Sequence, residues 1–160
     1  MVFHELPPVY SERSKVLILG SFPSPKSRET GFYYGHPQNR FWKVLAAVFG
    51  ETTPTTIEEK KAFLFAHDIA LWDVIASCEI VGAGDSTIRD AVPNDFSVIC
   101  SAAKIKAVFT TGKTAAKLYK KFTGSDSIVL PSPSPANCAV SMGDMVKEYE
   151  IIKQILSEEK

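Results

Sequence analysis

The stretch KVLILGS, residues 15–21, decides the fold, because four consecutive apolar residues run directly into a glycine. Short apolar runs of this kind are typical of strands that are buried on both faces of a parallel sheet. Three further runs have the same character: IALWDVI (residues 69–75), IKAVFT (residues 105–110) and SIVL (residues 127–130). Together the four runs predict a central sheet of four strands.

Helical patterns lie between these runs. Phe41, Leu45 and Val48 recur at helical spacing, and residues 57–67 follow a threonine-rich stretch that offers an N-cap. Strands that alternate with helices predict βαβ units. We therefore expect an α/β fold, a three-layer α/β/α sandwich with a central, mainly parallel four-stranded sheet, in a single domain of residues 1–160. Further helices are expected at residues 96–103, 114–122 and 144–158.

The composition predicts a folded chain without a metal or cofactor. The chain has 160 residues, of which 45% are hydrophobic and 22% charged, and this is the size of one domain. Its three cysteines are widely spaced and form no C-x-x-C pair, so neither a disulfide framework nor a cysteine-based metal site is expected. The stretch TTGKT, residues 110–114, imitates the end of a P-loop, but Ala107 stands where the motif needs its first glycine.

Charge and hydropathy say less about function. The net charge is +0, yet residues 103–123 hold six lysines and no acid. Such a stretch fits a face that meets phosphates, but the charge pattern alone favours solvated helix faces. There is no run of 18 apolar residues and no signal-peptide pattern at the start, so we expect a cytoplasmic protein without a membrane span.

Two long loops follow predicted strands and open at the same edge of the sheet. The first reads GSFPSPKSRETGFYYGHPQNRFW, residues 20–42, and the second reads LPSPSPAN, residues 130–137. Open α/β sheets bind ligands beyond the carboxyl ends of their strands, and long ordered loops in compact domains are usually functional. Alternating prolines make the second loop stiff, which suits either a probe pressed into a DNA groove or a rigid turn.

These loops resemble those of the uracil-DNA glycosylase superfamily. Residues 31–42, GFYYGHPQNRFW, are similar to the G-x-x-F-x-H-P-x-N-R-F-W segment of mismatch-specific uracil-DNA glycosylases. GSFP (residues 20–23), the LPSPSPAN loop and LWDV (residues 71–74) followed by GAGDSTI look more like the hypoxanthine-DNA glycosylase branch. The resemblance covers most of the chain. It implies the uracil-DNA glycosylase-like fold and an enzyme that flips a deaminated base, hypoxanthine first and uracil second, out of DNA and hydrolyses its bond to the sugar.

The resemblance makes Asn39 the catalytic candidate. Phe22 stands where the mismatch-specific branch has a water-positioning asparagine, and Leu130 stands where many members have a histidine or asparagine. In the hypoxanthine branch the asparagine of H-P-x-N carries catalysis, and that position is Asn39. A neutral amide can accept from water and donate to a base carbonyl. No lysine Schiff base is needed, so we expect a monofunctional hydrolase without lyase action.

Four residues are expected around the flipped base. Tyr34 has the family position of the ring that stacks on it, although a packed core tyrosine is the alternative. Phe22 would keep the site dry, and Ser21, like Ser24, has a hydroxyl that can also hold phosphate. Asp73 closes the second predicted strand, where it either reads the base edge or caps a turn.

The proline-rich loop is expected to contact DNA. Ser132 would bind phosphate, and Ser134 with Pro135 would form a wedge. His36, Asp85 and Ser86 are secondary candidates. A histidine in a turn is more often structural, and the Asp-Ser pair could simply cap a short helix. The complete set of expected DNA contacts is Ser24, Ser132, Pro133, Ser134, Pro135 and Asn137.

The implied partner is double-stranded DNA with a damaged base, bound by a monomer without cofactor or metal. The implied location is the cytoplasm, in association with the nucleoid. Because Phe22 and Leu130 remove the usual polar pair, a second interpretation stays open. In it the chain is a DNA-binding relative of the same fold with weak or no catalysis.

Overall fold

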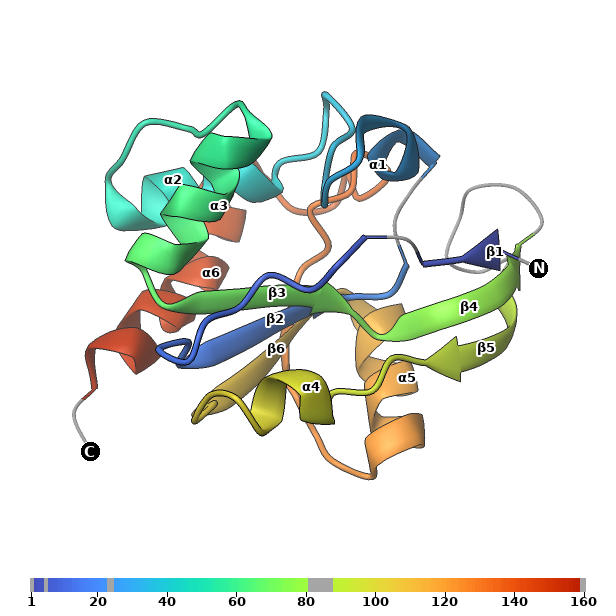
Figure 1. Ribbon diagram of the computed structural model, residues 1–160. Helices are drawn as coiled ribbons and strands as arrows, with labels where there is room; N and C mark the ends of the chain where they lie inside the picture. The colour runs from blue at the N-terminus through green and yellow to red at the C-terminus, as the bar shows by residue number, and fades with distance from the viewer. Residues whose placement is uncertain (1, 5, 23–24, 81–87, 159–160) are drawn as a thin grey trace.

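A parallel sheet forms the centre of the computed structural model, which describes residues 2–4, 6–22, 25–80 and 88–158. Its four strands lie in the order β3-β2-β6-β7, and each neighbouring pair is parallel (Figure 1). The predicted four-stranded parallel sheet is thereby confirmed. The strands are β2 (Val16–Gly20), β3 (Ile69–Asp73), β6 (Ala107–Thr111) and β7 (Ile128–Leu130).

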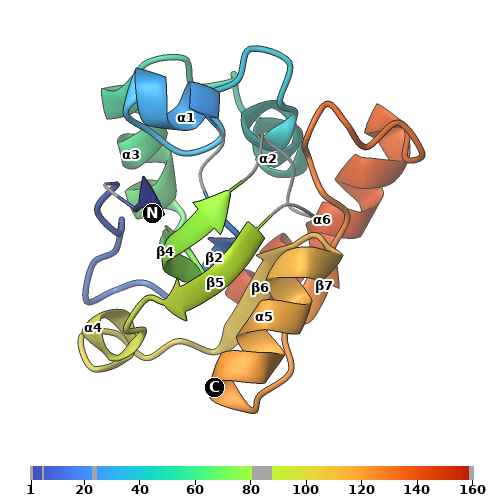
Figure 2. The same cartoon turned by 90° about the vertical axis from the view of Figure 1, so that its right-hand side faces the viewer.

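Helices cover both faces of this sheet, which confirms the predicted three-layer sandwich. The helices α2 (Phe41–Phe49), α3 (Ile57–Ala66) and α6 (Met142–Ser157) lie on one face (Figure 1). The helices α4 (Ser97–Cys100) and α5 (Lys113–Thr123) lie on the other face. The loop expected at residues 20–42 contains one more short helix, α1 (Pro25–Thr30), beyond the carboxyl ends of the strands (Figure 2).

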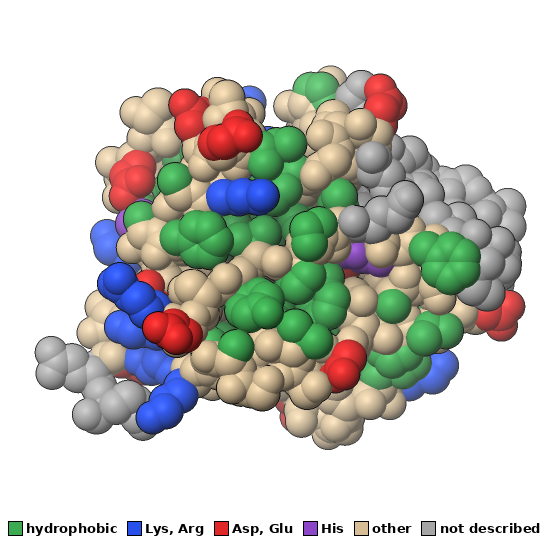
Figure 3. All heavy atoms as spheres, viewed as in Figure 1, with side chains coloured by type: hydrophobic (Ala, Val, Ile, Leu, Met, Phe, Trp, Pro, Cys, Tyr) green, Lys and Arg blue, Asp and Glu red, His purple; other side chains and the backbone are tan. Residues whose placement is uncertain are grey.

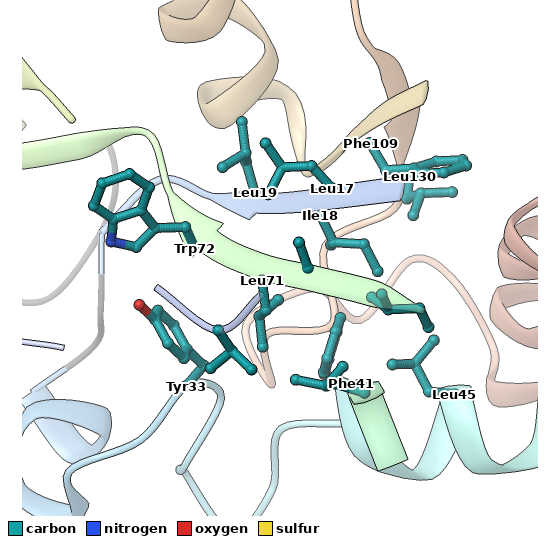
Figure 4. Packing of buried hydrophobic residues seen from close by; sticks show 14 of the residues in the cluster. Leu17, Ile18, Leu19, Tyr33, Phe41, Leu45, Leu71, Trp72, Phe109 and Leu130 are labelled. Carbon is teal, nitrogen blue, oxygen red and sulfur yellow. The ribbon is translucent and has the colours of Figure 1, made fainter. Parts of the chain in front are cut away.

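Buried side chains of β2 fill the layers on both of its sides. Leu17 and Leu19 point to one face of the sheet, whereas Ile18 points to the other (Figure 4). Ile18 is paired in register with Leu71, and both lie on the side of Phe41 from α2. Burying a large aliphatic or aromatic side chain contributes about 1.5–3 kcal/mol. This packing fixes the carboxyl ends of the strands in place.

A second, antiparallel sheet lies at the edge where the parallel strands end (Figure 2). It has the order β1-β4-β5 and was not expected from the sequence. The run of residues 69–75 was interpreted as one strand, but β3 ends at Asp73 and β4 begins at Ile75. The sequence shows no break between the two strands because the bonding to β2 continues: Val74 N donates to Gly20 O, at the end of β2, and Ile75 N donates to Ser21 O, one residue beyond it. The strands are β1 (Val2–Phe3), β4 (Ile75–Ile80) and β5 (Ile88–Pro93).

Helix α4 is much shorter than predicted. It spans only Ser97–Cys100 of the expected residues 96–103. The chain has to return to the sheet soon afterwards, because Lys106 N donates to Lys15 O next to the start of β2. The position of the helix was therefore correct, and its length was wrong.

Helix α3 begins with a capping box at the threonine-rich stretch. Thr56 Oγ1 accepts from Glu59 N at 3.0 Å, and Glu59 Oε1 accepts from Thr56 N at 3.2 Å. Glu59 Oε1 also accepts from Thr55 N at 2.9 Å. The N–H of Thr55, followed by that of Thr56, holds the pKa of Glu59 below its ordinary value. These bonds satisfy backbone donors that a helix start otherwise leaves open.

We expect Thr56→Ala to lower the free energy of unfolding by about 1 kcal/mol, because the cap is lost. Urea unfolding followed by circular dichroism measures it. The control Thr52→Ala, at an exposed position before the helix, should change the value by less than about 0.5 kcal/mol. Folding lowers the pKa of Glu59. The stabilisation that its carboxylate gives to the folded state is therefore present above the unfolded pKa and is lost as the pH falls through the folded pKa. Equal effects of both variants would contradict the capping box.

Candidate active site

Three polar side chains converge on Gly20, where β2 ends. The sheet register pairs Gly20 with Asp73 at the end of β3. A Cβ atom on Gly20 would lie 2.5 Å from Asp73 Oδ1, 3.1 Å from Tyr34 Oη and 3.6 Å from Thr111 Oγ1. We call these three residues, Asp73, Tyr34 and Thr111, the Gly20 cluster. It requires glycine at position 20, because even a methyl group would collide with the carboxylate.

Tyr34 is held in a strained conformation. Its φ angle is 54°, in the left-handed region that costs a non-glycine residue about 1–2 kcal/mol. Two contacts hold it there. The ring stacks on Phe41 with centroids 3.9 Å apart and 16° between the planes, and the hydroxyl lies 2.8 Å from Thr111 Oγ1. Such strain persists only where the surroundings fix the residue, and it is often found at functional sites.

Asn39 lies at the start of α2. Its Oδ1 accepts from Phe41 N at 2.9 Å, and its own N–H donates to His36 O at 2.9 Å. The amide oxygen thus forms a turn that leads into the helix, whose N-cap residue is Arg40, and this leaves the Nδ2 group as the donor that can address a ligand. Asn39 bonds to the backbone N–H of Phe41 and Tyr34 stacks on the ring of the same residue, so both expected site residues contact Phe41.

Arg40 connects the proline-rich loop, residues 130–137, and the residues that follow it up to Val140 to the same helix start. Its guanidinium donates to Asn137 O and to Val140 O, both at 2.7 Å. Its backbone N–H donates to Pro133 O at 3.0 Å. A planar guanidinium that spans two carbonyls fixes both distance and orientation. The loop therefore lies beside Asn39, although the two are about a hundred positions apart in the sequence.

The polar side chains of this loop stabilise the loop itself. Ser132 Oγ accepts from Ser134 N, and Ser134 Oγ accepts from Ala136 N, each at 3.2 Å. Asn137 Nδ2 donates to Ser132 O at 2.9 Å. Pro133 is buried, whereas Pro135 and Ala136 are exposed at the loop tip. The loop thus has a preformed shape with a small, apolar tip.

Asp73 forms a buried pair with His4, which lies 69 residues earlier in the chain. His4 Nε2 lies 2.9 Å from Asp73 Oδ2, and the two side chains are only 2% and 5% exposed. Asn94 Nδ2 donates to the backbone oxygen of Asp73 at 2.9 Å, where the chain passes from β3 to β4. The carboxylate is therefore fixed at Oδ2 by His4 and faces Gly20 with Oδ1.

The two positions that depart from the family pattern are both buried. Phe22 packs its ring edge-on against His4, with centroids 5.9 Å apart. Leu130 belongs to the hydrophobic core and is paired in register with Thr111. Ser21 is buried beside Phe22. The surroundings of the Gly20 cluster are thus largely apolar.

The remaining candidates divide into two groups. His36 Nδ1 accepts from Gln38 N at 3.0 Å, which gives this histidine a structural role in the turn. Ser24, Asp85 and Ser86 lie outside the described residues. Within the described ranges, no group of three or more His, Cys, Asp or Glu side chains could hold a metal ion, and no helix is long and apolar enough to cross a membrane.

Positive charge on the face seen in Figure 3 lies mainly away from the candidate site. There, most Lys and Arg side chains gather at the left, away from the carboxyl ends of the parallel strands. In α5, Lys113 and Lys117 are exposed, and Lys120 Nζ lies 3.3 Å from Asp126 Oδ1. These observations favour solvated helix faces for much of this charge.

Sequence reasoning missed Arg40, His4 and Thr111. Arg40 stands within the HPQNRFW segment, but its partners are backbone oxygens that no sequence pattern reveals. His4 offered no spacing signal, because its partner is 69 residues away. Thr111 lies in the TTGKT stretch, which forms the junction between β6 and α5.

Comparison with known proteins identifies the family. A family model, the uracil DNA glycosylase superfamily, matches residues 7–157. A hypoxanthine DNA glycosylase from Methanosarcina acetivorans is 36% identical over 141 residues, covering 86% of this chain and 89% of the relative. One from Methanosarcina barkeri is 34% identical over 135 residues, covering 82% and 85%. The solution NMR structure of a candidate uracil DNA glycosylase from M. acetivorans aligns with a TM-score of 0.77 and 31% identity, over 96% of this chain and 99% of that one. The chain belongs to the uracil DNA glycosylase superfamily.

Proposed function

We propose that the protein is a monofunctional DNA glycosylase that hydrolyses the N-glycosidic bond of a flipped deaminated base in base-excision repair. Hypoxanthine is the first candidate for this base, and uracil is the second. Family membership and the names of the two Methanosarcina relatives support the reaction class. The observation that carries the proposal is the convergence of Asn39, Tyr34 and the proline-rich loop at the start of α2.

Asn39 acts on the departing base. Cleavage builds positive charge on the sugar and negative charge on the base, so a preorganised donor that faces the base lowers the barrier. The oxygen of Asn39 is occupied by Phe41 N, which orients Nδ2 as that donor. Because the hydrogen bond from Phe41 N fixes the amide before the substrate arrives, the donor needs no reorganisation during the reaction.

Tyr34 and the tip of the proline-rich loop hold the base outside the duplex. Extruding a base costs a few kcal/mol. Stacking on an aromatic ring returns about 1–3 kcal/mol per base. Ser134 and Pro135 form the wedge together with the exposed Ala136, and the internal bonds of the loop give it the stiffness to enter a groove. Ser132, Ser134 and Asn137 keep hydrogen-bonding groups that can reach phosphate.

The surroundings of the reaction favour hydrolysis without strand cleavage. Phe22 and Leu130 contribute buried apolar surface, and in a dry site hydrogen bonds are stronger. The neutral amide of Asn39 supports a mechanism in which water, and not a lysine amine, attacks the sugar. We extend the proposal to duplex DNA as substrate, one domain and a monomer as the active unit, and the nucleoid in the cytoplasm as its location.

Asn39→Ala and Asn39→Asp should both lower the single-turnover rate of hypoxanthine release by about a hundredfold, as expected for loss of a preorganised donor. Aspartate keeps an oxygen that can accept from Phe41 N, so Asn39→Asp should retain the unfolding free energy of about 1 kcal/mol that Asn39→Ala loses with this hydrogen bond. Rates are measured on a hypoxanthine-containing duplex, and melting temperatures by circular dichroism.

The exposed neighbour provides the matched control, since Gln38→Glu makes the same amide-to-carboxylate change one residue away. This variant should retain its rate within about threefold. If Asn39→Asp cleaved as fast as the wild type, the residue would act as an acceptor for water and not as a donor. Base binding without release by the wild type would favour the inactive DNA-binding relative.

Arg40→Gln should weaken binding to a duplex that contains an abasic-site analogue by about tenfold or more, because the wedge loses two charge-assisted hydrogen bonds. Fluorescence anisotropy measures the affinity. Arg13→Gln is the control, because Arg13 is 82% exposed and its Nε lies 3.9 Å from Asp68. If both variants bound the duplex with equal affinity, the hydrogen bonds of Arg40 to the loop would not contribute to DNA binding.

A further inference from the structure

The buried pair of His4 and Asp73 has no role in the mechanism above. Three aromatic rings enclose the imidazole: those of Phe22 and Tyr33 lie at 5.9 Å and that of Trp72 at 6.5 Å between centroids. Burying a carboxylate in such surroundings is costly unless it is paired and hydrogen-bonded. The buried carboxylate of Asp73 lies directly beside Gly20 and is itself part of the Gly20 cluster.

The N-terminal segment is built to hold His4 in place. His4 N donates to Ala76 O at 2.7 Å, and β1 pairs with β4 on the preceding residues. The hydroxyl of Tyr33 lies 2.9 Å from Pro7 O and 3.2 Å from Leu6 O, and these two carbonyls share its single hydrogen. Burial, followed by the charge of Asp73, raises the pKa of Tyr33 far above its ordinary range, so this hydroxyl stays a donor. These hydrogen bonds hold the N-terminal segment in place, so the position from which His4 reaches Asp73 is fixed.

The pair presents one defined acceptor. Because His4 Nε2 occupies Asp73 Oδ2, the other oxygen faces Gly20 near Tyr34 Oη. An ionised carboxylate only accepts hydrogen bonds. A base that is stacked against Tyr34 would therefore face Asp73 Oδ1, a hydrogen-bond acceptor whose orientation is fixed by the bond of His4 to Oδ2.

We infer that His4 is a positioning residue for base selection: it fixes Asp73 so that Oδ1 accepts a ring N–H of the flipped base. This inference rests on the proposed function and specifies its substrate class. Hypoxanthine carries N1–H next to a carbonyl, and uracil carries N3–H next to a carbonyl. Adenine and cytosine, their undeaminated precursors, have a lone pair at the same ring nitrogen. A fixed carboxylate binds the first pair and repels the second, and buried polar groups of this kind discriminate strongly.

Three variants separate positioning from a structural role. His4→Leu removes the donor, whereas His4→Gln keeps an N–H at a similar reach. In Asp73→Asn, the amide oxygen has to turn toward the His4 donor, so its NH₂ group takes the place of Oδ1. His67→Leu is the control. His67 Nε2 lies 2.7 Å from Glu51 Oε2, so it also forms a histidine–carboxylate pair, but neither residue belongs to the Gly20 cluster.

The readout is the ratio of affinities for two duplexes, one with hypoxanthine and one with adenine at the target position. Both carry a fluorine on the sugar carbon next to the glycosidic bond, which blocks hydrolysis. Single-turnover cleavage of the unmodified hypoxanthine duplex is measured in parallel. Thermal melting accompanies each variant, so a loss of folding is recognised.

His4→Leu and Asp73→Asn should each reduce the affinity ratio by about tenfold or more and lower the cleavage rate by a similar factor. His4→Gln should restore both within about threefold, and His67→Leu should match the wild type. An unchanged ratio in folded His4→Leu and Asp73→Asn would overturn the inference. A wild type that binds hypoxanthine selectively but does not cleave it would refute the proposed function while supporting selection by the pair.

Discussion

The start of α2 is the constraint on which the candidate site depends. Three consecutive residues there make different contacts: Asn39 accepts from the first N–H of α2, Arg40 binds the proline-rich loop, and Phe41 stacks on Tyr34. Phe41 is also fully buried in the core, where it packs with residues of the parallel sheet. The sheet therefore fixes the position of all three contacts. A shift of this helix start would move the amide, the ring and the wedge together.

The second organising feature is the edge where β2, β3 and β6 end. Parallel strands bring their carboxyl ends to the same side, and here they deliver Gly20, Asp73 and Thr111 to one point. The hydrogen bond between the hydroxyls of Tyr34 and Thr111 helps to hold Tyr34 in its strained backbone conformation at this point. The chemistry that this arrangement supports is positioning and charge stabilisation, which suits the cleavage of a bond whose sugar product is already a reactive cation.

The fold was predictable because its decisive elements are local. The apolar run at residues 15–21 and its three counterparts need no partner to be recognised as buried strands. The second sheet was not predictable, since IASCEI and IRDAVP mix polar residues with a proline and show no clean alternation. The run of residues 69–75 also hides a change from one sheet to the other at Asp73.

The candidate site was predictable only in part. Asn39 and Tyr34 stand in a motif of rare residues, so a resemblance could single them out. The contribution of Arg40 depends on carbonyl groups 97 and 100 residues away, and that of His4 depends on a carboxylate 69 residues away. Such pairs are created by the topology, which a pattern along the chain does not contain.

The most direct test of this account is a crystal structure of the protein with a duplex that carries an uncleavable hypoxanthine nucleotide. The account predicts that the base is extruded, that its plane lies parallel to the ring of Tyr34, and that Asn39 Nδ2 lies within about 3.2 Å of a base acceptor. A base that stays stacked in the duplex, or that binds away from the start of α2, would contradict it.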